Sequence, residues 1–196
     1  MRIDHVLYAV TDLDEAGVRF EREHGLVSSP GGDHPLFGTG NRIVPLGDAY
    51  VELIAVTDPA IAAQNPIGRG VGALAEAGGG WLGWVVAVDD IEQRAARLGT
   101  VVIPGHRLRP DGITVSWRAA GMERMLEDLA FPFFIAWDDP GSHPGLREGA
   151  HGRLTIEVGC DAAALRIWLG DLPGWITVAT PAGGVQRVLL DGRPIG

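Results

Sequence analysis

Two ionisable side chains stand in sequences that predict buried β-strands. His5 lies in DHVLYAV and Glu52 lies in YVELIAV. Strand alternation groups His5 with Ile3 on one face, and Glu52 with Tyr50. A carboxylate buried among apolar side chains needs a partner, which a metal ion, an arginine, a histidine or solvent could supply. We therefore predict that His5 and Glu52 belong to a site, with proton transfer or ligand binding as its chemistry.

Two further basic side chains could join this site. His34 lies in GGDHPLFGTGN, a glycine-rich stretch that we expect to form a loop, with Thr39 and Asn41 building its turn. If the loop folds over the site, His34 contacts the ligand directly or only orients the loop. Arg107 lies in HRLRPDG, and a guanidinium is well suited to bind a substrate carboxylate, although arginines in such segments are commonly solvated.

Aromatic side chains could form the apolar part of the site. Trp137 shares its strand alternation with Phe133, and Trp117 lies on another predicted strand. Aromatic walls suit an apolar or planar ligand. Ordinary core packing is the alternative for each of the three residues.

The elements that must position these residues recur along the chain. IDHVLYAVTDLDEA and WLGWVVAVDDIEQR are each an apolar run, an acidic residue and a helical pattern. YVELIAVTDP and FPFFIAWDDP then match each other in the same order. Two copies of one unit are therefore predicted, at residues 1–59 and 80–140.

The acidic residues predict where the two helices begin. Asp12 with Glu15 fits a capping box, and Asp90 with Gln93 fits the same device. Gly25 and its counterpart in the second copy predict the helix ends.

The rest of the chain divides into a linker and a third copy. Residues 60–79 predict a linker with room for a short helix. Residues 141–196 predict a third, partial unit packed on the same domain, in which LTIEVGCDAAALRIWLGD repeats the strand, cap and helix. We expect two more strands, at 174–182 and 185–195, that extend or cover a sheet edge.

These motifs resemble those of a known superfamily. The most specific stretches are DHVLYAVTDLDEA, GGDHPLFGTGNRIVPLGDAYVELIAVTDP, RPDGITVSW, and PFFIAWDD followed by the HP pair at 143–144. Over nearly the whole chain they resemble the glyoxalase-like branch of the vicinal-oxygen-chelate superfamily, which includes glyoxalases, bleomycin-resistance proteins and dioxygenases. The resemblance implies an α+β fold of paired βαβββ units that form one cupped mixed sheet, plus a C-terminal β-α-β-β extension.

The resemblance also implies a ligand set for a metal. In the superfamily the positions of His5 and Glu52 supply metal ligands that face the cup. Their counterparts in the second unit are Gly83 and Phe133, which offer no ligand, and His34 is then the predicted third ligand. The ion would be Zn, Fe, Mn or Ni, and a site without metal is equally compatible with the sequence.

Two functions follow from this resemblance. One is a metal-assisted lyase, isomerase or dioxygenase in which Glu52 or a histidine moves a proton. The other is a binding or resistance protein that holds a small molecule without metal and without turnover. In both cases we expect a ligand whose polar head meets His5 and Glu52 and whose apolar body lies against Phe133 and Trp137, in room that Gly83 leaves free.

The composition excludes several other classes. The net charge is −9 and every basic residue except histidine is arginine, which disfavours a nucleic-acid partner and excludes Schiff-base or phosphate-loop lysine chemistry. A single cysteine predicts a reducing, cytoplasmic location, and the arginine-only, Ala- and Gly-rich composition is typical of a bacterial protein. There is no long apolar run and no signal-peptide pattern, so we expect no membrane partner. A monomer and a homodimer are both compatible with the sequence.

Overall fold

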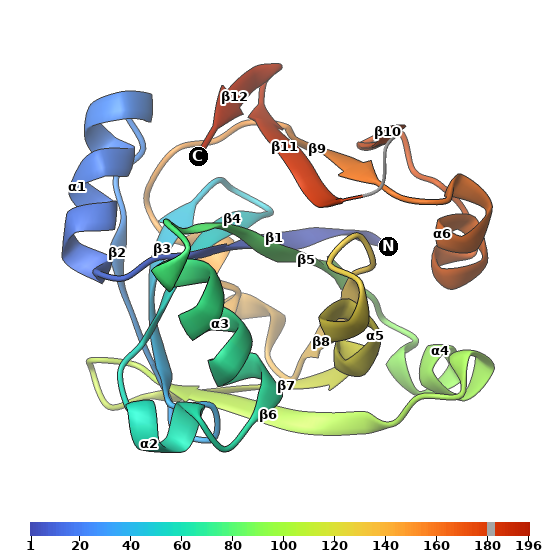
Figure 1. Cartoon of the computed structure of the whole chain (residues 1–196), viewed down its shortest axis with the longest axis horizontal. Helices are drawn as coiled ribbons and strands as arrows, with labels where there is room; N and C mark the ends of the chain where they lie inside the picture. Colours follow the sequence, from blue (N-terminus) through green and yellow to red (C-terminus); the bar gives the residue numbers. More distant parts are fainter. Residues whose placement is uncertain (180–182) are drawn as a thin grey trace.

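The duplicated units of the chain close into one eight-stranded barrel, and the C-terminal part forms a second sheet (Figure 1). The computed structural model describes residues 1–179 and 183–196. The barrel strands are β1 (Arg2–Ala9), β2 (Ser29–His34), β3 (Thr39–Pro45), β4 (Tyr50–Val56), β5 (Gly80–Ala87), β6 (Val102–Leu108), β7 (Thr114–Ala120) and β8 (Phe133–Trp137). They pair in the order β1-β4-β3-β2-β6-β7-β8-β5.

The two units have the same topology, as the internal repeat predicts. Each begins with a strand that pairs in parallel with the last strand of its unit, β1 with β4 and β5 with β8. Each continues through a helix, α1 (Leu13–His24) or α4 (Ile91–Leu98), into an antiparallel meander. The units meet along β1 and β5, which pair antiparallel. The predicted α+β fold of paired βαβββ units is therefore confirmed.

The helix ends follow the sequence signals with one exception. The side chain of Asp12 accepts hydrogen bonds from the amides of Asp14 and Glu15, and Gly25 ends α1 in the left-handed conformation at φ 68°. Asp90 makes no side-chain capping bond, so the second predicted capping box is wrong. The backbone of Asp90 has φ −111° and ψ 38° rather than the extended conformation that directs a capping side chain back to the helix.

The predicted linker is mostly helical. It contains α2 (Pro59–Ala62) and α3 (Pro66–Glu76), and their N-termini are capped by the side chains of Asp58 and Asn65. A further short helix, α5 (Met122–Glu127), lies between β7 and β8 and contacts α3. The short helix for which the linker had room is α3, an amphipathic helix whose buried residues include Val71.

The C-terminal part forms its own sheet instead of extending the barrel edge. It runs β9 (Leu154–Gly159), α6 (Ala162–Leu169), β10 (Ile176–Ala179), β11 (Gly184–Leu190) and β12 (Arg193–Ile195), and the strands lie in the order β10-β9-β11-β12. The strand expected at 174–182 corresponds to β10, and residues 180–182 lie outside the described residues. Two 3₁₀ turns, η1 (Pro140–Ser142) and η2 (Pro144–Leu146), connect the barrel to this sheet.

The barrel separates an outer core from an inner apolar cluster. Outside, Trp84 of β5 is fully buried and meets Trp175 edge to face, with ring centroids 5.9 Å apart, so the second sheet covers this wall. Inside, the cluster includes Leu7, Val85 and Phe133. The inner cluster includes Phe133, a residue predicted for the site, so the site is expected inside the barrel, between its two units.

Within the described part of the chain, no helix is long and apolar enough to cross a membrane.

Candidate small-molecule site inside the barrel

A cavity lies inside the barrel, is lined by residues of both units and opens to solvent. One part of its lining is polar and consists of His5, His34, Asn41, Tyr50, Glu52 and Arg107. The rest is mainly apolar and includes Ile67, Trp117, Met125, Phe133, Ile135 and Trp137. The predicted catalytic, ligand-binding and metal-ligating residues all line this cavity, whereas Gly83 does not.

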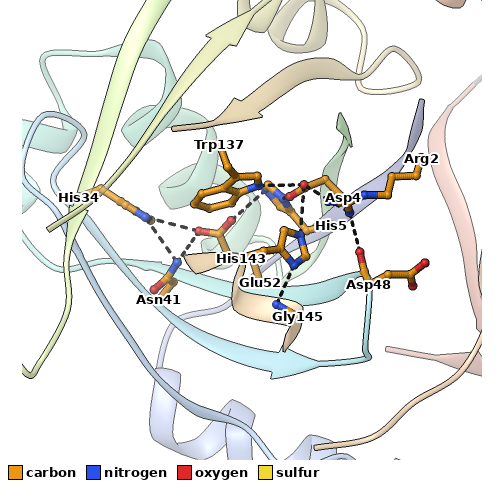
Figure 2. Close-up of polar contacts among 10 residues, drawn as sticks. All are labelled: Arg2, Asp4, His5, His34, Asn41, Asp48, Glu52, Trp137, His143 and Gly145. Atoms are coloured by element: carbon orange, nitrogen blue, oxygen red, sulfur yellow. Dashed lines mark hydrogen bonds and ion pairs between the residues drawn. The ribbon is translucent and has the colours of Figure 1, made fainter. Parts of the chain in front are cut away.

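His5 and Glu52 meet at the polar wall, as strand alternation predicts (Figure 2). His5 Nε2 lies 3.3 Å from Glu52 Oε2, and the His5 ring stacks on Tyr50 with centroids 4.5 Å apart. Burial opposes the charge on both groups. Even so, hydrogen bonds to Asp4 and Glu52 raise the pKa of His5 to about 9. The His5 hydrogen bond, together with the charges of His34 and His5, lowers the pKa of Glu52 to about 2.

Asn41 and His34 complete the polar wall beside Glu52. Asn41 Nδ2 donates to Glu52 Oε1 at 2.7 Å and lies 3.4 Å from His34 Nε2, while His34 Nδ1 lies 3.1 Å from Thr39 Oγ1. The predicted glycine-rich loop is instead largely strand, since His34 ends β2 and Thr39 begins β3. Burial and the charge of Arg107 outweigh the opposing charge of Glu52 and lower the pKa of His34. Asn41, assigned to a turn from the sequence, holds the catalytic candidate Glu52.

A β-bulge brings an unpredicted residue, Asp4, into the site. The register of β1 against β5 shifts between Ile3 and His5, so Asp4 is the extra residue. Its Oδ1 lies 2.7 Å from His5 Nδ1. The predicted grouping of Ile3 with His5 is wrong for the same reason, because Ile3 joins the outer core instead. Simple alternation places neighbouring residues on opposite faces, and a bulge breaks that rule.

Two residues that are distant in sequence also reach Asp4. Trp137 Nε1 donates to Asp4 Oδ2 at 3.0 Å, and His143 Nε2 lies 3.2 Å from the same oxygen (Figure 2). Burial favours the neutral carboxyl, but hydrogen bonds from His143 and His5 hold the pKa of Asp4 below its usual range. The sequence offered only the HP pair as a signal for His143, with no chemistry attached to it.

Arg107 is the charged group of the cavity that lacks a partner. Its side chain comes from β6 and the residue is 2% exposed. Its Nε and Nη2 atoms are buried and form no hydrogen bond. A buried charge without a partner is unfavourable, so native proteins rarely keep one unless a ligand or ion meets it.

The apolar wall differs from the prediction at Gly83. A Cβ atom on this residue would lie 2.7 Å from Met125 Sδ, so the methionine of α5 fills the room that the glycine leaves. Phe133 stays at the wall, with its ring 6.2 Å from that of His5, and Trp117 packs against Trp137 at 5.5 Å. The apolar wall therefore includes the rings of Phe133, Trp117 and Trp137 and the flexible thioether of Met125.

The comparisons with known proteins agree with this fold. The family model of the glyoxalase-like domain matches residues 3–165. The chain belongs to this family. No curated protein has a matching sequence. This glyoxalase-like chain resembles the structure of a hypothetical protein from Staphylococcus aureus, at 18% identity, with 99% of this chain and 83% of that chain covered and a TM-score of 0.71.

A second similar structure is that of an enzyme. Streptomyces coelicolor methylmalonyl-CoA epimerase (Q60A), in complex with 2-nitronate-propionyl-CoA, is 18% identical, with 71% of the glyoxalase-like chain and 99% of the epimerase covered and a TM-score of 0.51. At this identity the likeness establishes the fold of the glyoxalase-like chain. The predicted resemblance to the vicinal-oxygen-chelate superfamily is confirmed.

The glyoxalase-like chain does not arrange its predicted ligands as a metal site. Among residues 1–179 and 183–196, no group of three or more His, Cys, Asp or Glu side chains is placed to hold a metal ion. His5 meets carboxylates through both ring nitrogens, and the Asn41 amide lies between Glu52 and His34. The second unit adds no ligand, since Gly83 is covered by Met125. Glu52 lies 3.3 Å from His5 Nε2 and 3.7 Å from His34 Nε2, and the metal set of these three residues stays a prediction.

Proposed function

We propose that the cavity binds a small organic carboxylate with an apolar body, without a metal. Arg107 carries this proposal, because its Nε and Nη2 atoms are buried in the cavity lining without a partner. These two atoms lie on one edge of the guanidinium, where their N–H groups match the two oxygens of a carboxylate. A ligand of this kind would satisfy both donors at once.

The aromatic part of the lining supports an apolar body on this ligand. Phe133, Trp117 and Trp137 line the cavity. Each ring that the ligand covers would contribute about 1–2 kcal/mol to binding through removal of apolar surface from water. Discrimination would come from the charged end, where an uncharged analogue leaves Arg107 unpaired.

Calorimetry with matched probes tests this function. Benzoate, phenylacetate and hexanoate are titrated beside their uncharged amides, into the parent chain, Arg107→Met and Arg109→Met. Arg109 is the control, because it stands two residues away and already pairs with Asp111 at 2.5 Å. We expect the carboxylates to bind the parent and Arg109→Met, and Arg107→Met to lose about tenfold or more in affinity, since a charged hydrogen-bonded contact is worth about 1.5–3 kcal/mol. Equal binding of carboxylates and amides to the parent would overturn the proposal.

A second function, acid–base isomerisation of the bound carboxylate, is favoured by Glu52. This side chain lines the cavity and, with a pKa of about 2, is the ionised base at neutral pH. It could remove a proton from the carbon next to the ligand carboxylate, and His5 could return one. An epimerase shares the fold, which is an analogy at the level of the fold alone.

Deuterium exchange separates the two functions. A carboxylate found to bind is incubated with the chain in D₂O, and the hydrogen on its α-carbon is followed by NMR. Isomerisation chemistry predicts exchange in the parent and its loss in Glu52→Gln, with binding retained. Binding without exchange in the parent leaves the chain as a binding protein.

A further inference from the structure

We propose that Trp117 is a specificity-determining residue of the cavity, whose indole N–H donates a hydrogen bond to a carbonyl oxygen on the body of the ligand. Trp117 lines the same cavity as Arg107. The inference rests on the proposed function and deepens it, because it adds a second polar group to the carboxylate that Arg107 would hold. The expected ligand is an acid with a keto or ester carbonyl separated from its carboxylate by a short apolar chain.

The two indole rings that line the cavity differ in the partner of their N–H group. Trp137 Nε1 donates to Asp4 Oδ2 at 3.0 Å. Trp117 Nε1 donates to no atom of residues 1–179 and 183–196. An indole nitrogen can only donate, so a ligand that covers Trp117 must supply an acceptor or leave this N–H unpaired. An unpaired buried donor is unfavourable, and the site therefore discriminates against ligands without an acceptor at this place.

The ring of Trp117 lies over Gly105 on the neighbouring strand. These two residues pair directly between β6 and β7. A Cβ atom on Gly105 would lie 2.4 Å from Trp117 Nε1 and 2.6 Å from its Cε2, so a larger residue would displace the ring. The backbone of Gly105 does not itself require glycine, because its φ is not positive. The close approach of the indole therefore accounts for this glycine.

Two aromatic neighbours hold the Trp117 ring in this orientation. Trp137 pairs with Trp117 across β7 and β8, and their ring centroids are 5.5 Å apart. The ring of His34, at the end of β2, lies 6.2 Å away with its plane at 89° to the indole. The indole is thus in contact with rings from two other strands and with the backbone of β6. A donor that is held in place before the ligand arrives loses little conformational freedom on binding, which favours recognition.

The indole donor and the guanidinium stand along the same strand. Gly105, which lies under Trp117 Nε1, and Arg107 both line the cavity and are two residues apart on β6. Two residues of a strand span about 6.6 Å. A carbonyl two methylene groups from the carboxylate suits this spacing better than a carbonyl directly beside it, which would compete for the same donors. We therefore expect a preference for 4-oxo acids.

Calorimetry with a matched pair of acids tests the inference on the full chain. The pair is 4-oxo-4-phenylbutanoate and 4-phenylbutanoate, which differ only by a carbonyl in place of a methylene group. We expect the parent to bind the oxo acid about threefold to tenfold more tightly, the effect of one hydrogen bond. Trp117→Phe and Gly105→Ala should bind both acids equally. Phe133→Leu is the control, because it removes a ring without a donor from the same lining, so it should weaken both acids alike and keep the preference.

The hydroxyl of Tyr50 is the alternative donor in the cavity. It lines the cavity and bonds no atom of the described residues, but it comes from β4 and its ring stacks on His5. Tyr50→Phe should therefore keep the preference for the oxo acid. Loss of the preference in Tyr50→Phe, with retention in Trp117→Phe, would assign the contact to Tyr50 and overturn the inference.

Nitrogen–proton NMR of the parent detects the same donor without any variant. The indole N–H signal of Trp117 is assigned through its own backbone signals. We expect this signal to move further downfield with 4-oxo-4-phenylbutanoate than with 4-phenylbutanoate. It should also move with butyrophenone, an uncharged ketone that has a methyl group in place of the carboxylate.

The outcomes separate this inference from the proposed function. If both acids bind through Arg107 with equal affinity, the carboxylate proposal stands and the role of Trp117 is overturned. If neither acid binds, the carboxylate proposal fails and butyrophenone still decides the role of Trp117. An indole signal that this ketone does not move would overturn the inference in that case as well.

Discussion

At the scale of single residues, the buried guanidinium of Arg107 lowers the stability of the unliganded fold. Its buried, unpartnered Nε and Nη2 atoms are unfavourable in the unliganded fold. We expect Arg107→Met, which keeps an apolar side chain and removes the charge, to raise the free energy of unfolding by about 1–3 kcal/mol in urea titrations. Arg109→Met should change it by less than about 0.5 kcal/mol. A clear loss of stability in Arg107→Met would mean that the guanidinium is already satisfied.

His5 should make stability fall on the alkaline side. Its pKa is raised from 6.5 to about 9, so its contribution is fully present below pH 6.5 and is lost as the pH rises through 9. Such a shift corresponds to at most about 3 kcal/mol. Urea unfolding at pH 6, 7.5 and 9.5 should show this decline in the parent and a flatter profile in His5→Gln. The same decline in both proteins would assign the effect to another group.

Sequence reasoning found part of the polar wall for a clear physical reason. Alternation in two strands, together with the superfamily pattern, was sufficient to predict that His5 and Glu52 meet. Asp4 could not be found because a bulge reverses its face, and Asn41 could not because its type favours turns as much as buried bonds. His143 lies 139 residues from Asp4, and nothing local in the sequence indicates that contact.

At the scale of elements, two helices of equal length, α4 and α6, differ in their N-terminal capping contacts. Both α4 and α6 have 8 residues, but only Asp161, before α6, accepts bonds from the amides of the first turn. We expect Asp161→Ala to lower the free energy of unfolding by about 1 kcal/mol. Asp90→Ala should lower it by about 0.5 kcal/mol at most, through the helix dipole and an exposed contact with Arg94. Equal losses would show that the Asp90 side chain caps α4 in solution.

Helix α5 controls the apolar end of the cavity through Met125. A Cβ on Gly83 would lie 2.7 Å from Met125 Sδ, so Gly83→Ala must displace the thioether toward the cavity. We expect a loss of stability of about 1–2 kcal/mol and weaker binding of the bulkier carboxylates by calorimetry. Gly72→Ala on α3 is the control, since its Cβ would meet only Val56 at 3.6 Å. That variant should gain about 0.5–1 kcal/mol from its helix propensity.

At the scale of the whole molecule, the internal repeat predicted the architecture but not its closure. Two equal units imply one shared cup, and the pairing of β1 with β5 confirms that they join. Whether β2 and β6 also meet depends on tertiary approach, for which no local pattern exists. The third partial unit likewise predicted its strands, except that the one expected at 185–195 is divided into β11 and β12. Their separation into a second sheet depends on packing over Trp84.

The barrel closes through a narrow seam between β2 and β6. β2 and β6 share a single residue pair, Asp33 with Leu108, whereas β1 and β5 share pairs along their whole length. The approach depends on Gly32, which has φ 139° and whose Cβ would lie 2.0 Å from the carbonyl oxygen of Leu108.

Amide hydrogen exchange follows seam opening, because amides that face an unpaired edge are protected least. In the parent we expect the β6 amides that face β2 to exchange faster than those that face β7, and a bound carboxylate on Arg107 to slow them. Gly32→Ala should push β2 away from β6 and speed this exchange further, while the β1–β5 amides stay protected. Uniform exchange along β6 in the parent, or loss of protection across the whole barrel in Gly32→Ala, would show that the seam does not open as a separate unit.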